Sequence, residues 1–161
     1  MRIHYKEKKR WALPFDGDTH ILFYRKSLLA KHNLAPPETW DDFLYVSRTI
    51  TEKEKTNGIY GSAIMAYKVP VLILSSFLNR VGAYGGQLLT PDGKPSLDTP
   101  EVLAALTALV EHAKYALPSP LETSFEVSRD AFLSGRVAMV EQWTDLGVMA
   151  EDSSESTIQK D

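Results

Sequence analysis

The chain has 161 residues, 43% of them apolar, and its 18 basic and 21 acidic residues give a net charge of −3. This length predicts one domain, or one lobe of a larger protein, with enough apolar residues for a core. The near balance of charge offers no basic field to nucleic acid or anionic lipid. There is no cysteine, which excludes disulfides and thiolate metal sites and leaves the redox compartment open.

The N-terminal residues lack the apolar core of a secretory signal peptide. No apolar run approaches the roughly 20 residues of a membrane span. The longest run, residues 69–74, is interrupted by Pro70. Taken alone, these features indicate a cytoplasmic protein, or a piece of a protein whose export signal is absent.

Residues 21–24, Ile-Leu-Phe-Tyr, are apolar on both faces, as in a buried strand. Asp16 and Asp18 precede this strand, where a loop could offer carboxylates to a ligand. A short helix is predicted over 27–32, with Leu28 and Leu29 turned inward and a left-handed residue at its end.

Thr39 is a good N-cap, and Asp42 stands three residues later, as in a variant of the capping box. The spacing predicts a helix to about residue 54, ending before an Asn-Gly pair. Trp40 begins the amphipathic pattern of this helix, so a packing role is favoured over a ligand platform.

A second strand is predicted over 59–65, and Pro70 suits the first turn of the next helix. That helix carries an apolar stripe at a spacing of 3.6 residues, formed by Val71, Leu74, Phe77, Leu78 and Val81. A small hairpin is predicted around Pro91-Asp92-Gly93, because proline presets φ and glycine permits a positive φ.

Thr99 and Pro100 begin a helix to about residue 115, whose predicted buried stripe is Val102, Leu106, Leu109, Val110 and Ala113. A further helix is predicted over 124–133. Residues 137–140 form a strand that delivers Glu141, Gln142 and Trp143 at its end. Residues 151–161 are polar and low in aromatics, which predicts a disordered tail.

This order of elements predicts an α/β lobe, rich in helix, with a small mixed sheet flanked by helices. Residues 1–150 are assigned to a single domain and residues 151–161 to the tail. No internal repeat is present.

Common catalytic patterns are absent from the sequence, including the P-loop, GxGxxG, GxSxG, HExxH and the EF-hand. The four histidines have no ligand spacing, and no metal or cofactor is expected. One enzymatic alternative is a small glycoside hydrolase that pairs Asp16 or Asp18 with Glu141, since such enzymes use two carboxyls across the sugar.

The same residue types suit sugar binding without catalysis, because carboxylates and amides bind hydroxyls and aromatic rings cover C–H faces. Three places combine them. Asp16 and Asp18 precede a strand, and Glu141, Gln142 and Trp143 close another. The third is a helix end with Phe77, Tyr84, Gly85 and Gly86, where glycine permits close backbone approach.

The segment over 11–43, WALPFDGDTHILFYRKSLLAKHNLAPPETWDDF, resembles the family 1 extracytoplasmic solute-binding proteins, which capture sugars for ABC importers. Later stretches are similar to that family in the expected order. These are 58–61 (GIYG), 85–89 (GGQLL), 92–94 (DGK), 98–101 (DTPE) and 132–139 (FLSGRVAM) followed by Trp143. One departure is Arg25, where the family usually has the asparagine that caps the first helix.

The resemblance implies one lobe of a type II periplasmic-binding-protein fold, in which two lobes close on a ligand. It implies that Asp18 binds ligand hydroxyls, that Tyr84, Gly85 and Gly86 line the cleft, and that Trp143 stacks on the sugar. It further implies a sugar or polyol solute, an ABC permease as partner and a periplasmic or extracytoplasmic location, and no enzymatic activity.

Family members run to about 400 residues, so this chain corresponds to a central segment that forms most of the C-terminal lobe. A remaining alternative is an interaction or remnant domain that binds no small molecule. Such a lobe would expose an apolar face where the missing elements pack, and that face would favour self-association.

Overall fold

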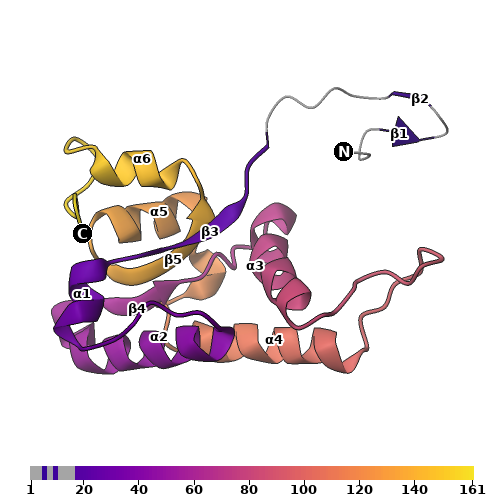
Figure 1. The fold of residues 1–161 in the computed structure, drawn as a ribbon, viewed down its shortest axis with the longest axis horizontal. Helices are drawn as coiled ribbons and strands as arrows, with labels where there is room; N and C mark the ends of the chain where they lie inside the picture. The colour runs from indigo at the N-terminus through magenta and orange to yellow at the C-terminus, as the bar shows by residue number, and fades with distance from the viewer. Residues whose placement is uncertain (1–4, 7–8, 11–16) are drawn as a thin grey trace.

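The computed structural model describes residues 5–6, 9–10 and 17–161 (Figure 1). Asp16, a predicted ligand-binding residue, lies outside the described residues. Strands β1 (Tyr5–Lys6) and β2 (Lys9–Arg10) form a short antiparallel pair. In the described residues, no helix is both long enough and apolar enough to cross a membrane.

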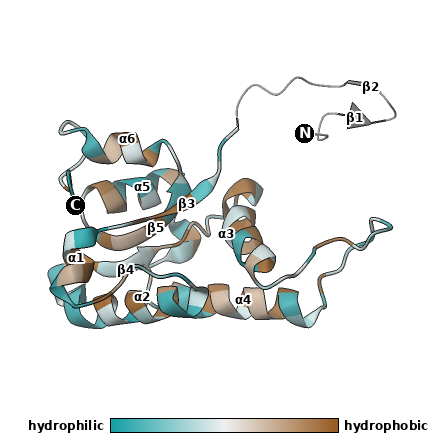
Figure 2. Cartoon of the chain, in the orientation of Figure 1, coloured by the Kyte–Doolittle hydropathy of each residue, from teal (hydrophilic) through white to brown (hydrophobic). Residues whose placement is uncertain are grey.

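The central sheet has three strands in the order β3 (His20–Tyr24), β5 (Val137–Trp143) and β4 (Tyr60–Ala63). Strand β5 pairs antiparallel with β3 and parallel with β4, so the predicted mixed sheet is confirmed. The register places His20 opposite Trp143 and Leu22 opposite Glu141. Strand β5 is buried along almost its whole length because it lies between the other two. Figure 2 shows the hydropathy of this strand and of the helices around it.

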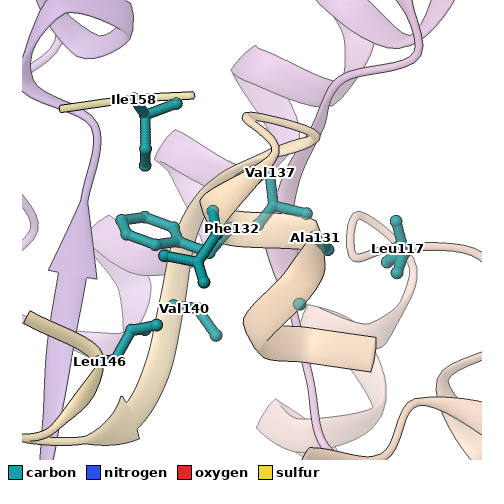
Figure 3. Close-up of a cluster of buried hydrophobic side chains, with 9 residues drawn as sticks. Leu117, Ala131, Phe132, Val137, Val140, Leu146 and Ile158 are labelled. Atoms are coloured by element: carbon teal, nitrogen blue, oxygen red, sulfur yellow. The ribbon is translucent and has the colours of Figure 1, made fainter. Parts of the chain in front are cut away.

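Helices cover both faces of this sheet (Figure 1). The remaining elements are α1 (Lys26–Lys31), α2 (Trp40–Glu54), α3 (Pro70–Ala83), α4 (Pro100–Ala113), α5 (Phe125–Leu133), α6 (Leu146–Glu151) and the 3-10 turns Lys55–Asn57 and Pro120–Glu122. On one face, Phe132 and Leu133 of α5 pack with Val140 and Leu146 in one core cluster (Figure 3). On the other, α1 and α2 pack on Ala138 and Met139.

Local sequence signals set several element ends as predicted. Thr39 Oγ1 accepts a hydrogen bond from the Asp42 amide at 3.1 Å, and Asp42 Oδ2 accepts one from the Thr39 amide at 3.0 Å. This is a capping box, so α2 begins where the sequence predicts. The predicted hairpin is present in minimal form, with a single bridge between Leu89 and Pro95.

Helix α3 buries only part of the apolar stripe that its sequence presents. Of that stripe, Val81 is buried and Phe77 packs against the core, and the other buried residues are Leu72, Ser76 and Arg80. Val71 is 61% exposed, and Leu74 and Leu78 are also exposed. The buried face includes part of the polar side of the helix, because Ser76 bonds the Met65 carbonyl and Arg80 bonds Glu141, so periodicity alone does not specify which face meets the core.

Helix α4 differs from its predicted stripe in the same way. Val102 and Leu109 are buried as predicted, and His112 joins them. Leu106 and Val110, predicted to be buried, are exposed on the outer side of the helix. Helices α3 and α4 pack against each other through apolar residues that include Phe77, Val102 and Leu109, and further apolar residues remain on the outer sides of both helices.

Residues 151–161 differ from the disordered tail that the sequence predicts. The Thr157 amide donates to the Leu133 carbonyl at 2.9 Å, and Ile158 joins the core cluster beside α5. Asp161 accepts from the Ser27 amide at 2.6 Å and from Arg25 Nε at 2.9 Å.

Arg25 offers α1 no side-chain cap, as its sequence predicts. The Asp161 carboxylate therefore satisfies an amide in the first turn of α1, which local sequence leaves open. The sequence predicted disorder because the segment is polar overall. The burial of Ile158 and the ion pair between Asp161 and Arg25 depend on distant parts of the chain, which composition does not reveal.

Candidate functional site

A buried ion pair joins strand β5 to helix α3. Arg80 Nη2 donates to Glu141 Oε1 at 2.8 Å, and Arg80 Nη1 donates to Oε2 of the same carboxylate at 3.3 Å. Asn79 Nδ2 donates to Glu141 Oε2 at 3.1 Å. Arg80 is 0% exposed and Glu141 is 7% exposed, so the pair is shielded from solvent screening.

The rest of the Arg80 guanidinium is also satisfied. Nη1 donates to the Ser76 carbonyl at 2.7 Å, and Nε donates to His112 Nδ1 at 3.1 Å. Its central carbon lies 4.1 Å from the centroid of the Trp40 ring, a cation–π contact. Arg80 therefore connects α2, α3, α4 and β5, and Trp40 has the packing role that the sequence favoured.

The charge state of His112 decides whether its ring can accept a hydrogen bond from Arg80. Burial lowers the pKa of His112 to about 4, and the positive charge of Arg80 acts in the same direction. The neutral ring accepts from Arg80, whereas a protonated ring would set two cations against each other.

We expect the folded state to lose stability in acid through His112. Its folded pKa of about 4 lies below the ordinary value of 6.5, so the unfolded chain binds the proton more readily. The contribution is complete above pH 6.5 and falls as pH drops toward 4, by about 3 kcal/mol. Urea unfolding of the native chain across this range measures the slope.

The control for this experiment is His112→Gln, whose amide retains an acceptor for Arg80 without titrating. Its unfolding free energy should vary less between pH 6.5 and 4 than that of the native chain, by about the same 3 kcal/mol. Equal slopes for the two proteins would contradict the role assigned to His112.

Glu141 also borders a cavity of about 510 Å³. Tyr84 lines the same cavity from the end of α3, and Trp40 lines it from the start of α2. The remaining lining residues are Leu22, Pro37, Glu38, Thr39, Asp41, Phe43 and Ala83. The cavity thus combines aromatic rings with carboxylates, a composition that suits a solute with both hydroxyls and C–H faces.

A second group of side chains lies where β3 begins and β5 ends. Asp18 Oδ1 accepts from Thr144 Oγ1 at 2.5 Å and from the Thr19 amide at 2.7 Å. The bond from Thr144 is the main reason that the pKa of Asp18 is lowered, so its carboxylate is ionised. Asp18 is exposed. It can therefore accept hydrogen bonds from hydroxyl groups of a ligand.

Trp143 ends β5 and directly precedes Thr144, the residue that bonds the Asp18 carboxylate. Its ring centroid is 4.3 Å from that of His20 in a T-shaped arrangement and 5.6 Å from that of Phe125. The indole is half-buried. An aromatic ring at a strand end next to an ionised carboxylate can stack on a sugar while the carboxylate binds its hydroxyls.

Asn79 connects the cavity to this edge of the sheet. Its Nδ2 lies 3.0 Å from His20 Nδ1 as well as 3.1 Å from Glu141 Oε2. Burial lowers the pKa of His20, which keeps the ring neutral and able to accept at Nδ1. The structure therefore brings Tyr84 with Glu141 and Asp18 with Trp143, and joins the two groups through Asn79 and His20.

Other predicted site residues have local structural roles. Gln142 is 0% exposed, because β5 continues through it and turns it to the opposite face from Glu141 and Trp143. There Gln142 Nε2 donates to Ser128 Oγ at 3.1 Å. The strand runs to Trp143, three residues further than the sequence predicted, and it buries Gln142 on the face away from Glu141 and Trp143.

Phe77 packs in the core between α3 and α4, in contact with two of the hydrophobic clusters. Gly85 ends α3 with a φ of +76°, which favours glycine. Gly86 packs closely on Val81 and Val102, where an added Cβ would lie 3.1 Å from a methyl group. Both glycines are thus explained by the end of the helix, and Tyr84 is the member of this group that faces the cavity.

Sequence reasoning missed His20, Asn79 and Thr144. His20 is two residues after Asp18. Residues two apart in an extended segment lie on the same face, so this spacing could have identified His20 from the sequence. Asn79 lies inside an apolar helix and has no local signal. Within the described part of the chain, no group of three or more histidine, aspartate, glutamate or cysteine side chains is arranged to hold a metal ion.

The chain is similar to known solute-binding proteins. Residues 3–157 match the model of the family described as "Bacterial extracellular solute-binding protein". A Deinococcus radiodurans protein named "Probable ABC transporter-binding protein" is 27% identical over 136 residues, which is 82% of this chain and 32% of that protein.

Solved structures share the fold. A solute-binding protein of Agrobacterium radiobacter K84 in complex with ribitol has a TM-score of 0.85 and 24% identity, and the match covers 96% of this chain and 38% of that one. Maltose-bound MalE3 of T. maritima has a TM-score of 0.84 and 25% identity, covering 98% of this chain and 40% of that one. The fold implied by the sequence resemblance is confirmed.

This chain spans about a third of the length of the curated relative it matches. The match to the family model extends over nearly the whole chain, from residue 3 to residue 157. The chain belongs to the bacterial extracellular solute-binding protein family.

Proposed function

We propose that this chain is a solute-contacting lobe of an ABC importer's binding protein and that its ligand is a sugar or a polyol. The observation that carries the proposal is the pairing of Asp18 and Trp143 at one edge of the β3–β5 sheet. The family match supports it, as do neighbours that hold ribitol and maltose.

The chemistry of this edge suits a neutral polyhydroxylated ligand. The Asp18 carboxylate is ionised and exposed, so it accepts hydroxyl hydrogen bonds. The Trp143 indole offers a flat apolar surface to the C–H face of a pyranose ring. Tyr84 and Glu141 extend the proposed contact surface through the cavity beside α3.

Residues 1–150 would form one wall of the binding cleft, and a second lobe would close over it. The matched relatives are between two and three times as long as this chain. A single wall encloses a ligand only partly, so affinity for the isolated lobe is expected to be weak compared with a closed two-lobe protein.

The test is a thermal melt and calorimetric titration of the chain with mono-, di- and oligosaccharides and linear polyols. Native-state binding raises the melting temperature, by an amount equivalent to about 2.7 kcal/mol at a hundredfold excess over Kd. Asp18→Asn and Trp143→Ala should each weaken binding about tenfold or more, because both contacts are made directly with the ligand.

Matched control variants are Asp92→Asn, an exposed carboxylate in the hairpin turn, and Tyr45→Ala, an exposed aromatic side chain on α2. Both should bind like the native chain. A native chain that melts cooperatively and is not stabilised by any of these solutes would overturn the proposal for this lobe.

The geometry gives no support to the carbohydrate-enzyme alternative. Glycoside hydrolysis needs a general acid, which is a carboxyl group of raised pKa. The pKa of Asp18 is lowered, and Glu141 is held by Arg80 and Asn79. Members of this family serve in transport, and we infer that this lobe binds its solute without chemical change.

We further propose an extracytoplasmic location and an ABC permease as the partner that receives the solute. The family description and the name of the Deinococcus radiodurans relative both support this. Co-purification of a two-lobe protein that contains this sequence with its permease tests the second part.

A second candidate function is self-association through α3. Val71, Leu74 and Leu78 form an exposed apolar stripe at helical spacing, and exposed Tyr67 precedes them. Two copies related by a twofold axis could bury this stripe against itself. Sedimentation should show a concentration-dependent dimer that Leu74→Lys abolishes, and a monomer at all concentrations would contradict it.

A further inference from the structure

Two aromatic neighbours, His20 and Phe125, contact the Trp143 ring. His20 lies directly opposite Trp143 in the β3–β5 register, and their rings meet at 80°. Phe125, at the start of α5, contacts the indole at an angle of 48°. A ring held between two others has fewer accessible rotamers than one at an open strand end.

His20 is itself held from another element. Asn79 of α3 donates through Nδ2 to His20 Nδ1 at 3.0 Å. Because Nδ1 accepts, the neutral imidazole carries its proton on Nε2. Nε2 is buried and has no hydrogen-bond partner among the described residues, so the bond from Asn79 is what fixes the ring plane.

Asn79 is anchored in turn through Glu141. The same Nδ2 donates to Glu141 Oε2, whose carboxylate is bound in a forked contact by Arg80. A continuous series of contacts thus runs from the buried Arg80 through Glu141, Asn79 and His20 to Trp143. The side-chain hydrogen bonds of Asn79 go to His20 and Glu141, so Asn79 acts on the indole through His20.

We propose that His20 and Asn79 are positioning residues that hold the Trp143 indole at the angle required for stacking on the solute. The part that concerns the solute rests on the function proposed above. A prearranged ring loses less freedom when a ligand binds, and this favours ligands with a flat face over ligands without one. The pair would therefore affect selectivity between pyranosides and linear polyols.

The first arm of the test needs no ligand. The chain has three tryptophans, so a nitrogen-15 spectrum shows at most three indole N–H signals, and Trp143→Phe identifies the signal of Trp143. Asn79→Ala should lower the heteronuclear NOE of that signal and broaden it, while the Trp40 signal keeps its NOE. His20→Ala should do the same, and His20→Phe, which restores a ring that Asn79 cannot bind, should narrow the signal only in part.

Matched controls are Asn57→Ala and His32→Ala, which both contact Glu54 away from Trp143. Neither should change the Trp143 signal. An unchanged NOE and line width for Trp143 in Asn79→Ala and His20→Ala would overturn the proposal, whatever the ligand data show.

The second arm compares maltose with ribitol by titration calorimetry. Asn79→Ala should weaken maltose binding about three- to tenfold and leave ribitol binding unchanged, because a linear polyol has no ring face to stack. In a Trp143→Ala background, Asn79→Ala should cause no further loss. Equal losses for both ligands, or a further loss without Trp143, would contradict positioning through the indole.

The two arms separate the two proposals. If the native chain binds neither solute and the Trp143 signal still responds to Asn79→Ala, the proposed function fails for this lobe and the positioning role holds. If the solutes bind and the signal does not respond, the positioning role fails alone.

Discussion

Replacing Arg80 with methionine is expected to destabilise the fold by about 3–5 kcal/mol. The substitution removes the partner of Glu141, whose carboxylate is 7% exposed and keeps a single donor in Asn79. A buried charge without its counterion is costly, and the bond to the Ser76 carbonyl is lost as well. Urea unfolding measures the effect, and the melting temperature should fall by at least about 6 °C.

The matched control for Arg80→Met is Lys94→Met, which breaks the ion pair with Asp92. Both partners of that pair are well exposed, so its loss should cost less than about 1 kcal/mol. The double variant Arg80→Met, Glu141→Gln should recover much of the loss, because no unpaired charge remains. An Arg80→Met protein as stable as the native chain would show that the ion pair contributes nothing.

The substitution Gly61→Ala is expected to cost about 3 kcal/mol or more. A Cβ on this residue of β4 would lie 2.1 Å from the carbonyl oxygen of Ser47 and 2.3 Å from its Cα. These are backbone atoms of α2, so no side-chain rotation relieves the clash. Moving the helix away would also strain the bond from the Gly61 amide to Thr51 Oγ1, which is 2.8 Å long.

The comparison for Gly61→Ala is Gly82→Ala in the last turn of α3, where an added Cβ meets nothing within 4 Å. Alanine favours a helix over glycine, so this variant should be more stable than the native chain by up to about 1 kcal/mol. Thermal melts of the two variants should therefore move in opposite directions. A Gly61→Ala chain that melts with the native one would mean that α2 and β4 are less closely packed than described.

Local sequence determined the elements of this protein and many of their ends. The Thr39 and Asp42 pair gives the start of α2, and Thr99 with Pro100 gives the start of α4. These features were predictable because a cap is satisfied within four residues of chain, so its donors and acceptors are adjacent in the sequence. The family resemblance rested on the same kind of local pattern.

The tertiary structure decided which faces were buried. The apolar stripe of helix α3 predicts that Leu74 faces the core and that Arg80 faces outward, whereas the fold does the reverse. Burial of Arg80 becomes favourable only when Glu141, from a strand 61 residues away, is brought beside it. No local sequence pattern indicates that Arg80 and Glu141 will be in contact.

In the candidate site, too, local sequence indicated some residues and tertiary structure decided their contacts. Asp18 and Trp143 could be chosen from the sequence, because each lies at a predicted strand end. Their pairing depends on the antiparallel register that sets His20 opposite Trp143, and the link through Asn79 depends on the tertiary contact of α3 with β3 and β5. The sequence therefore identified Asp18 and Trp143 as candidate residues. Their contacts arise because strands and helices that are distant in the chain meet only on folding.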